Sequence, residues 1–144
     1  MIGDGYSSQV YRARCTLDNE YYAIKVIDLR KFTASSLEML DNEIRILNQM
    51  KHPNIITLEN VYRSASHCYL ITEYCGGGDL LNFMTKTGRM SEEQTLEIAV
   101  EVVEGVKYML DKGIIHRDIK PANIFRGKNS WKIGDFGFAI KSAT

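Results

Sequence analysis

Hydrophobic and polar positions over much of the first half of the chain follow the pattern of short β-strands. Runs rich in β-branched and aromatic residues alternate with polar turns, which is typical of strands. The expected strands are residues 10–15, 21–27, 55–62 and 68–74. The first two flank a turn at residues 17–20 and form a hairpin, and the polar segment 63–67 joins the last two. The pattern therefore predicts a β-rich first half.

One stretch of this first half has a helical period instead. From Ser35 or Ser36 onward the apolar residues recur on one side of a helix. They are Leu37, Leu40, Ile44, Leu47 and Met50. The sequence His52-Pro53-Asn54 ends this helix, because the residue before a proline is disfavoured in the helical region.

The segment Cys75-Gly76-Gly77-Gly78 interrupts every pattern and predicts a boundary between a β-rich part and a helical part. Directly after it, Asp79 can cap a short helix. Its apolar residues are Leu80, Leu81, Phe83 and Met84. Further on, residues 124–126 and 131–133 suit a small hairpin over the turn at residues 127–130.

Ser91-Glu92-Glu93-Gln94 is a capping box that opens a long helix, which ends at Gly113. Apolar residues occupy nearly half of its circumference, wider than the usual stripe of about 100°. They are Leu96, Ile98, Ala99, Val102, Val103, Val106, Met109 and Leu110. The residues that follow hardly suffice to cover this helix. We therefore expect a bare apolar face and a poorly soluble chain.

Composition narrows the class of protein without indicating its chemistry. The 18 basic and 18 acidic side chains of the 144 residues cancel, so no overall field favours nucleic acid or an anionic membrane. Three cysteines, Cys15, Cys68 and Cys75, lack the spacing of a metal site and predict free thiols. No apolar run reaches membrane-spanning length and no signal peptide is recognisable. These features predict a soluble intracellular protein, cytoplasmic, with no membrane segment.

Two short motifs in the first half suggest phosphate binding, each with a structural alternative. Gly3 and Gly5 precede a strand, so that backbone N–H groups could approach phosphates; taken alone, these residues are better explained by a plain glycine-rich turn. A dinucleotide fingerprint is excluded, because a strand follows where a helix should open. Lys25 stands in the middle of an apolar strand, with Glu43 as its expected counter-ion. Its alternative is an edge strand with the lysine in water.

The segment His116-Arg117-Asp118-Ile119-Lys120-Pro121-Ala122-Asn123 is more specific, because it places five polar or ionisable groups in eight positions. A carboxylate, an ammonium and an amide aimed at one point can position a hydroxyl, neutralise phosphate and hold a metal ion. Asp135 follows as a second isolated carboxylate after Ile133-Gly134. Together with Asn123 it offers the oxygen ligands that Mg²⁺ takes alongside substrate phosphates.

Five motifs in this order resemble the signature set of eukaryotic-type protein kinases, from Ile2 to about Lys141. They are G-x-G before a strand, A-I-K, a helix glutamate, H-R-D-x-K-x-x-N and D-F-G. The resemblance implies an α+β fold of two lobes. Residues 1–74 would form the N-lobe, 75–78 the hinge, and 79–144 the start of the C-lobe through D-F-G.

The resemblance also implies a site for ATP. Gly3 and Gly5 would lie over the phosphates, with Ser8 at the third glycine of the family pattern, and Lys25 would hold the α- and β-phosphates, oriented by Glu43. The adenine would contact Ile2, Val10, Ala23 and the backbone of Glu73 and Cys75, beside a gatekeeper Thr72, and Asp79 would reach the ribose. A hydrophobic spine would comprise Leu47, Leu58, His116 and Phe136.

For catalysis, the resemblance implies that Asp118 accepts the proton of the substrate hydroxyl, while Asn123 and Asp135 hold Mg²⁺. The D-x-K-P-x-N form of the loop resembles that of serine/threonine kinases, and its Lys120 would neutralise the γ-phosphate. The implied partners are ATP and a protein bearing Ser or Thr. The G-G-G-D-L and G-F-A stretches faintly resemble the autophagy-initiating and calcium/calmodulin-related groups.

The chain stops inside the activation segment, without the A-P-E motif, and begins just within the first strand. We expect a partial domain whose kinase activity belongs to the complete one. Two alternatives remain: a non-catalytic protein that binds nucleotide or another kinase, and a slow ATPase without a protein substrate. Lys25, Asp118 and Asp135 are all retained, which favours the first interpretation.

Overall fold

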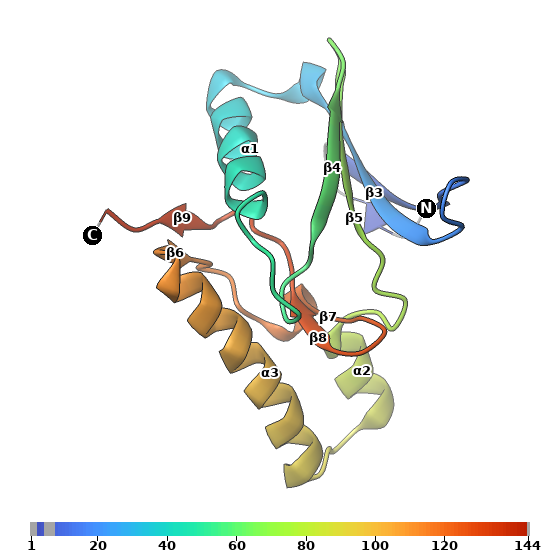
Figure 1. Cartoon of the computed structure of the whole chain (residues 1–144), viewed down its shortest axis with the longest axis vertical. Helices are drawn as coiled ribbons and strands as arrows, with labels where there is room; N and C mark the ends of the chain where they lie inside the picture. The colour runs from blue at the N-terminus through green and yellow to red at the C-terminus, as the bar shows by residue number, and fades with distance from the viewer. Residues whose placement is uncertain (1–2, 5–7, 144) are drawn as a thin grey trace. The chain divides into compact units, whose positions relative to one another are not determined.

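The computed structural model of the chain describes residues 3–4 and 8–143. They divide into two compact units (Figure 1). Unit 1 comprises Met1–Asn42 and Thr57–Tyr74, and unit 2 comprises Glu43–Ile56 and Cys75–Thr144. One division falls between Tyr74 and Cys75, where the glycine-rich boundary is expected. Residues 43–56 group with unit 2, although the lobe assignment from the resemblance counts them with the N-lobe.

Unit 1 contains a five-stranded antiparallel sheet in the order β1-β2-β3-β5-β4. Its strands are β1 (Gly3–Asp4), β2 (Ser8–Arg14), β3 (Tyr21–Asp28), β4 (Leu58–Arg63) and β5 (His67–Glu73). The predicted hairpin and the last two predicted strands are confirmed. β4 begins later than the predicted residue 55, because Ile55 instead forms a β-bridge with Ile133 of unit 2.

The helix α1 (Ala34–Leu47) confirms the helical period of the first half. Thr33 Oγ1 accepts a hydrogen bond of 3.2 Å from the Ser36 amide at its start. Leu40, Leu47 and Met50 of the predicted apolar side are buried, and so is Ile46, which the one-sided pattern omits. A short 3-10 helix, η1 (Leu29–Lys31), precedes α1 and was not predicted.

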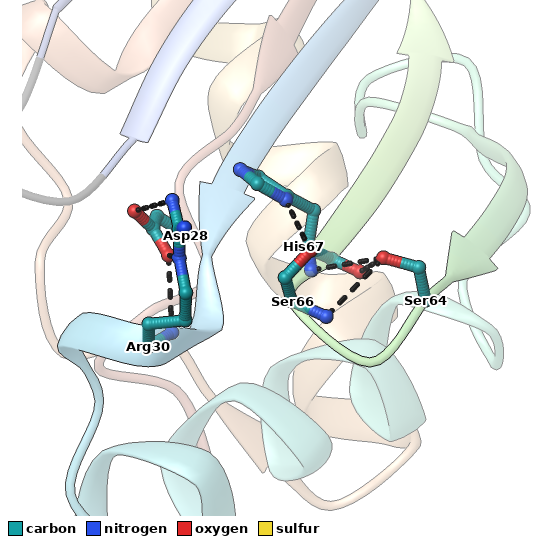
Figure 2. A network of polar contacts seen from close by, with 5 residues as sticks. All are labelled: Asp28, Arg30, Ser64, Ser66 and His67. Carbon is teal, nitrogen blue, oxygen red and sulfur yellow. Dashed lines mark hydrogen bonds and ion pairs between the residues drawn. The ribbon is translucent and has the colours of Figure 1, made fainter.

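A polar network closes one end of the sheet in unit 1 (Figure 2). The Arg30 guanidinium bonds both carboxylate oxygens of Asp28, at 2.9 and 3.0 Å, and its hydrogen bonding lowers the pKa of Asp28 to about 2. At the start of the neighbouring strand β5, Ser66 Oγ and His67 Nδ1 lie 2.8 Å apart. The Leu29 amide donates to the Ser66 carbonyl at 2.9 Å, so η1 and the β4–β5 turn are tied together.

Besides the end of α1, the described residues of unit 2 form two helices and two small antiparallel ribbons. The helices are α2 (Leu80–Thr87) and α3 (Glu92–Asp111), and a 3-10 turn η2 spans Pro121–Asn123. The ribbons pair β6 (Ile114–Ile115) with β9 (Ile140–Lys141), and β7 (Ile124–Arg126) with β8 (Trp131–Ile133). The β7–β8 hairpin confirms the sequence prediction, whereas the β6–β9 pair was not predicted.

The helix ends of unit 2 are where the sequence places them. The Asp79 carboxylate accepts a hydrogen bond from the Asn82 amide and caps α2. Ser91 and Gln94 form both hydrogen bonds of the capping box of α3. Gly113 follows α3 with a φ of 70°, a conformation that favours glycine over residues with a Cβ atom.

The segment before β4 is fastened to α3 and β8 by the side chain of Asn54, which is buried. Asn54 Nδ2 donates to Glu101 Oε2 and to the Trp131 carbonyl, at 2.9 Å each. Glu101 Oε2 also accepts from the Trp131 amide, and the Ile133 amide donates to the Asn54 carbonyl at 2.9 Å. These bonds set the position of β8, after which Asp135 follows.

The outer face of α3 is apolar and exposed, as its sequence predicts. Leu96 is 64% exposed, Val103 61% and Leu110 57%, and Ala99 is exposed as well. Val106, which the prediction also placed on this face, is half-buried. Among the residues that the structure describes, no helix combines the length and the apolar character needed to cross a membrane.

We predict that Gly105→Ala lowers the stability of the protein, although glycine to alanine in a helix normally stabilises it by about 1 kcal/mol. A Cβ atom at position 105 would lie 2.9 Å from the Asn54 carbonyl oxygen and 2.9 Å from Ile133 Cδ1. Because hydrogen bonds to α3 and β8 hold the Asn54 backbone in place, its carbonyl group cannot move away from the added Cβ atom at low energetic cost. Thermal unfolding measures the effect, with exposed Glu104→Ala on the same helix as the control. A melting temperature that rises on Gly105→Ala would contradict the close packing described here.

Candidate active site

The loop at residues 116–123 connects β6 to β7, includes η2, and is held by its own buried side chains. His116 and Asn123 are two of the three buried polar residues of the described chain. Arg117, between His116 and Asp118, has a φ of 68°, a conformation that residues with a Cβ atom adopt rarely. Such strain persists where the surrounding structure determines it, and it is frequent at functional sites.

Asn123 holds Asp118 in place from within this loop. Asn123 Nδ2 donates to the backbone carbonyl of Asp118 and to its Oδ2, at 2.9 Å each. Lys120 Nζ lies 3.6 Å from the other carboxylate oxygen, Oδ1. The structure thus brings three predicted catalytic and metal-binding residues together, with one carboxylate oxygen of Asp118 facing an amide and the other an ammonium.

The D-F-G segment is joined to this loop through Gly134. The Gly134 amide donates to the Asn123 carbonyl at 2.9 Å, and His116 Nε2 lies 2.8 Å from the Gly134 carbonyl. The Asp118 amide donates to His116 Nδ1 at 3.1 Å, so Nδ1 is the acceptor nitrogen and Nε2 carries the proton that binds Gly134. His116 therefore links the backbone of Asp118 to the backbone of the D-F-G segment.

Phe136 and Asp135 point in different directions from one short turn. The Phe136 side chain is buried and packs edge-on against His116, with ring centroids 4.9 Å apart. Asp135 is exposed and has a φ of 55°. Because a residue at positive φ sits on a sharply turned backbone, the anchored Phe136 and Gly134 leave the Asp135 carboxylate available to a ligand.

Arg117 makes a second connection between the two segments. Its Nε donates to the carbonyl of Phe138 at 2.7 Å, just beyond D-F-G. The Phe138 side chain itself is 55% exposed. The backbone after D-F-G is therefore held by a charged donor from the loop, and not by burial of its aromatic ring.

The donor set at this place fits Mg²⁺ by its chemistry. Asp135 supplies carboxylate oxygens, and the amide of Asn123, whose nitrogen donates to Asp118, has its carbonyl oxygen as the atom that could coordinate. Within the described part of the chain, no group of three or more His, Cys, Asp or Glu side chains could hold a metal ion. A magnesium ion bound here would take its further ligands from phosphate and water.

Among the predicted adenine-site residues, those of unit 1 lie on neighbouring strands. In the sheet register Val10 faces Lys25, Ala23 faces Thr72, and Tyr22 faces Glu73. Lys25 is half-buried in β3, which lies between β2 and β5, so the alternative of an edge strand is wrong. Ile2 and Gly5 lie outside the described residues, and Gly3 is in β1.

Three other predicted residues have structural surroundings besides the roles that the resemblance implies. Glu73 Oε1 accepts from the Thr57 amide at 2.8 Å, which fixes the end of β5. Both carboxylate oxygens of Asp79 accept from Asn82 as part of the α2 cap. Glu43 belongs to unit 2, where its Oε2 lies 4.0 Å from the position of a Cβ on Gly137. Its ion pair with Lys25 of unit 1 stays a prediction, as does the spine through Leu58.

Sequence reasoning missed the residues that hold the backbone segments leading into the site. Asn54 and Glu101 carry no catalytic motif; the available signal was a polar residue beside apolar ones, before Ile55-Ile56 for Asn54 and between Val100 and Val102 for Glu101. The sequence indicates Gly134 only as the end of an apolar strand. A Cβ atom there would lie 2.7 Å from the Phe125 ring, so its absence lets the D-F-G backbone approach β7.

The sequence pattern of the family described as "Protein kinase domain" matches residues 1–144. The human serine/threonine-protein kinase Nek5 is 37% identical over 142 residues, 96% of this chain and 20% of that protein. The serine/threonine-protein kinase atg1 of Dictyostelium discoideum is 36% identical over 148 residues, 96% of this chain and 22% of that protein. The calcium/calmodulin-dependent protein kinase type 1 of Macrobrachium nipponense is 38% identical over 125 residues, 86% of this chain and 36% of that protein.

The chain thus spans between about a fifth and about a third of the length of these relatives. Their nearly equal identities favour no one of the three over the others as a subgroup. The family match covers the loop at residues 116–123 and the D-F-G segment together, and the fold of both units agrees with it. The chain belongs to the protein kinase family.

Proposed function

We propose that this chain provides the ATP-binding and catalytic residues of a serine/threonine protein kinase, which transfers the γ-phosphate of ATP to Ser or Thr hydroxyls of proteins. One observation carries the proposal most directly. Asp118 is held by Asn123 at one oxygen, has Lys120 beside the other, and is joined through His116 to the turn that presents Asp135. Phosphoryl transfer depends on such positioning more than on covalent chemistry.

Each side chain has a role that its surroundings support. Asp118 would accept the proton of the substrate hydroxyl, because its carboxylate is oriented and half-exposed. Lys120 would place a positive charge where the γ-phosphate gains negative charge, and Lys25 would bind the α- and β-phosphates. Asn123 and Asp135 would hold Mg²⁺, which neutralises phosphate charge when it is bound.

The adenine and ribose would occupy the positions that the resemblance to protein kinases implies. Val10 and Ala23 would pack on the adenine, the backbone of Glu73 and Cys75 would hydrogen-bond it, and Asp79 would approach the ribose. In this scheme residues 1–74 form the N-lobe, 75–78 the hinge and 79–144 the start of the C-lobe. The names of all three relatives support a protein substrate, and those of Nek5 and atg1 support Ser or Thr as the acceptor.

The first test concerns nucleotide binding. We expect ATP with Mg²⁺ to raise the melting temperature, since a ligand at a hundred times its Kd stabilises a protein by about 2.7 kcal/mol. Asp135→Asn should remove the magnesium dependence of this shift before it removes binding of the nucleotide, because the carboxylate would hold the metal. A thermal-shift titration measures both. Well-folded protein that shows no response to ATP and Mg²⁺ would contradict the proposed function.

The second test separates catalysis from binding in the full-length protein. Asp118→Asn preserves the shape of the side chain but not its capacity to accept a proton, so kcat should fall by about 10²–10⁴-fold. The Kd for ATP should change little, since Asp118 positions the acceptor and not the nucleotide. Asp111→Asn, an exposed aspartate at the end of α3, is the matched control. Equal activity of Asp118→Asn and Asp111→Asn would refute the assigned role.

A further inference from the structure

Arg126 at the end of β7 fastens the glycine-rich segment that leads into α2. The Gly77 amide donates to the Arg126 carbonyl at 3.1 Å, and the Arg126 amide donates to the Gly78 carbonyl at 2.8 Å. Next to this pair, Asp79 forms an antiparallel β-bridge with Phe125. The segment is thus attached to β7 by two backbone hydrogen bonds and one β-bridge, immediately before the start of α2.

The two backbones approach closely at Gly77. A Cβ atom at position 77 would lie 2.7 Å from Arg126 Cβ, 2.9 Å from Cγ and 3.0 Å from Cδ. The stem of the arginine therefore lies directly over the glycine. Gly78 differs, because it has a φ of 74° and no heavy atom within 4 Å of its Cβ position. Gly77 leaves space for the arginine stem that lies over it, whereas Gly78 allows the positive φ of the backbone.

The charged end of Arg126 is held by two aromatic rings. Its guanidinium carbon lies 5.3 Å from the centroid of Phe83 and 5.7 Å from the centroid of Trp131. The two rings pack edge-on, 5.3 Å apart. Trp131 belongs to the buried cluster of Leu80, Ile98 and Ile124, against which Phe83 also packs. Arg126 is exposed, yet its side chain is restrained at both the stem and the head.

We infer that Arg126 is a positioning residue for the nucleotide. Its backbone and its stacked side chain hold residues 75–79 in one conformation, and this segment carries the Cys75 backbone and the Asp79 carboxylate that would contact adenine and ribose. The inference rests on the proposed function, since it takes ATP to be the ligand. Neither the sequence motifs nor the family match assigns a role to Arg126. A segment with three glycines is otherwise costly to order, and restraining it beforehand lowers that cost.

The close approach is tested first, by thermal unfolding of the full-length protein without nucleotide. Gly77→Ala should lower the melting temperature, and in an Arg126→Gly background its effect should fall by at least half, because the overlapping atoms are gone. Gly78→Ala is the control: its cost comes from its φ, and should be the same in both backgrounds. If Gly77→Ala costs as much without the arginine as with it, the inference is wrong.

The role in nucleotide binding is tested by measuring the Kd and the KM for ATP·Mg²⁺ in the same protein. Arg126→Ala should raise both by roughly three- to tenfold, while kcat at saturating ATP stays nearly unchanged. Arg126→Lys keeps the charge over the rings and should restore part of the affinity. Val102→Ala on α3 removes a side chain that packs against the same cluster, and should lower stability without changing the KM.

The outcomes separate this inference from the function on which it rests. A wild-type protein that binds no ATP contradicts the proposed function, and the nucleotide role of Arg126 with it. If the wild type binds ATP and Arg126→Ala binds it with the same Kd, only the inference about Arg126 is contradicted. So does a KM that rises equally in Val102→Ala, because general loosening of the cluster would then explain the effect.

Discussion

The hydrogen bonds of one buried amide, that of Asn54, determine how the parts of unit 2 fit together. Its nitrogen donates to a carboxylate oxygen of α3 and to a backbone carbonyl of β8, and its own backbone carbonyl accepts from β8. A buried polar group left without partners costs about 1–3 kcal/mol. Any displacement of α3 from β8 would break several of these bonds at once, so the relative position of the two elements is well defined.

The candidate site depends on this arrangement through a short series of contacts. β8 leads into Gly134, whose amide and carbonyl bond Asn123 and His116, and these two residues in turn bond Asp118. The backbone strain at Arg117 and Asp135 is tolerated because both neighbouring segments are anchored. The functional side chains thus lie on loops, as is common, while buried groups behind them fix their geometry.

Local patterns predicted the elements whose signals are local. The capping box at Ser91, the cap at Asp79 and the terminal Gly113 each satisfy helix-end groups through nearby residues, so a single sequence shows them. The motifs likewise placed Asp118, Lys120 and Asn123 in one loop before the structure showed their contacts. The lysine motif alone left open an edge strand, and only the sheet order excluded it for Lys25.

What could not be predicted arises from pairs distant in sequence. The late start of β4 follows from the bridge between Ile55 and Ile133, 78 positions apart by their numbers. The β6–β9 ribbon has only two residues in each strand, too few for a period-two pattern. The positive φ of Asp135 results from anchoring on both sides, and its own residue type does not reveal it.

Identification of the phosphorylated amino acid tests the central claim most directly. The full-length protein would be incubated with ATP, Mg²⁺ and a peptide library in which Ser, Thr or Tyr is the only acceptor, and the product would be analysed by mass spectrometry. The account predicts phosphoserine and phosphothreonine, formed only when Mg²⁺ is present and lost in Asp118→Asn. Predominant phosphotyrosine would contradict the interpretation of Lys120, and hydrolysis of ATP without any phosphorylated peptide would contradict the assignment as a protein kinase.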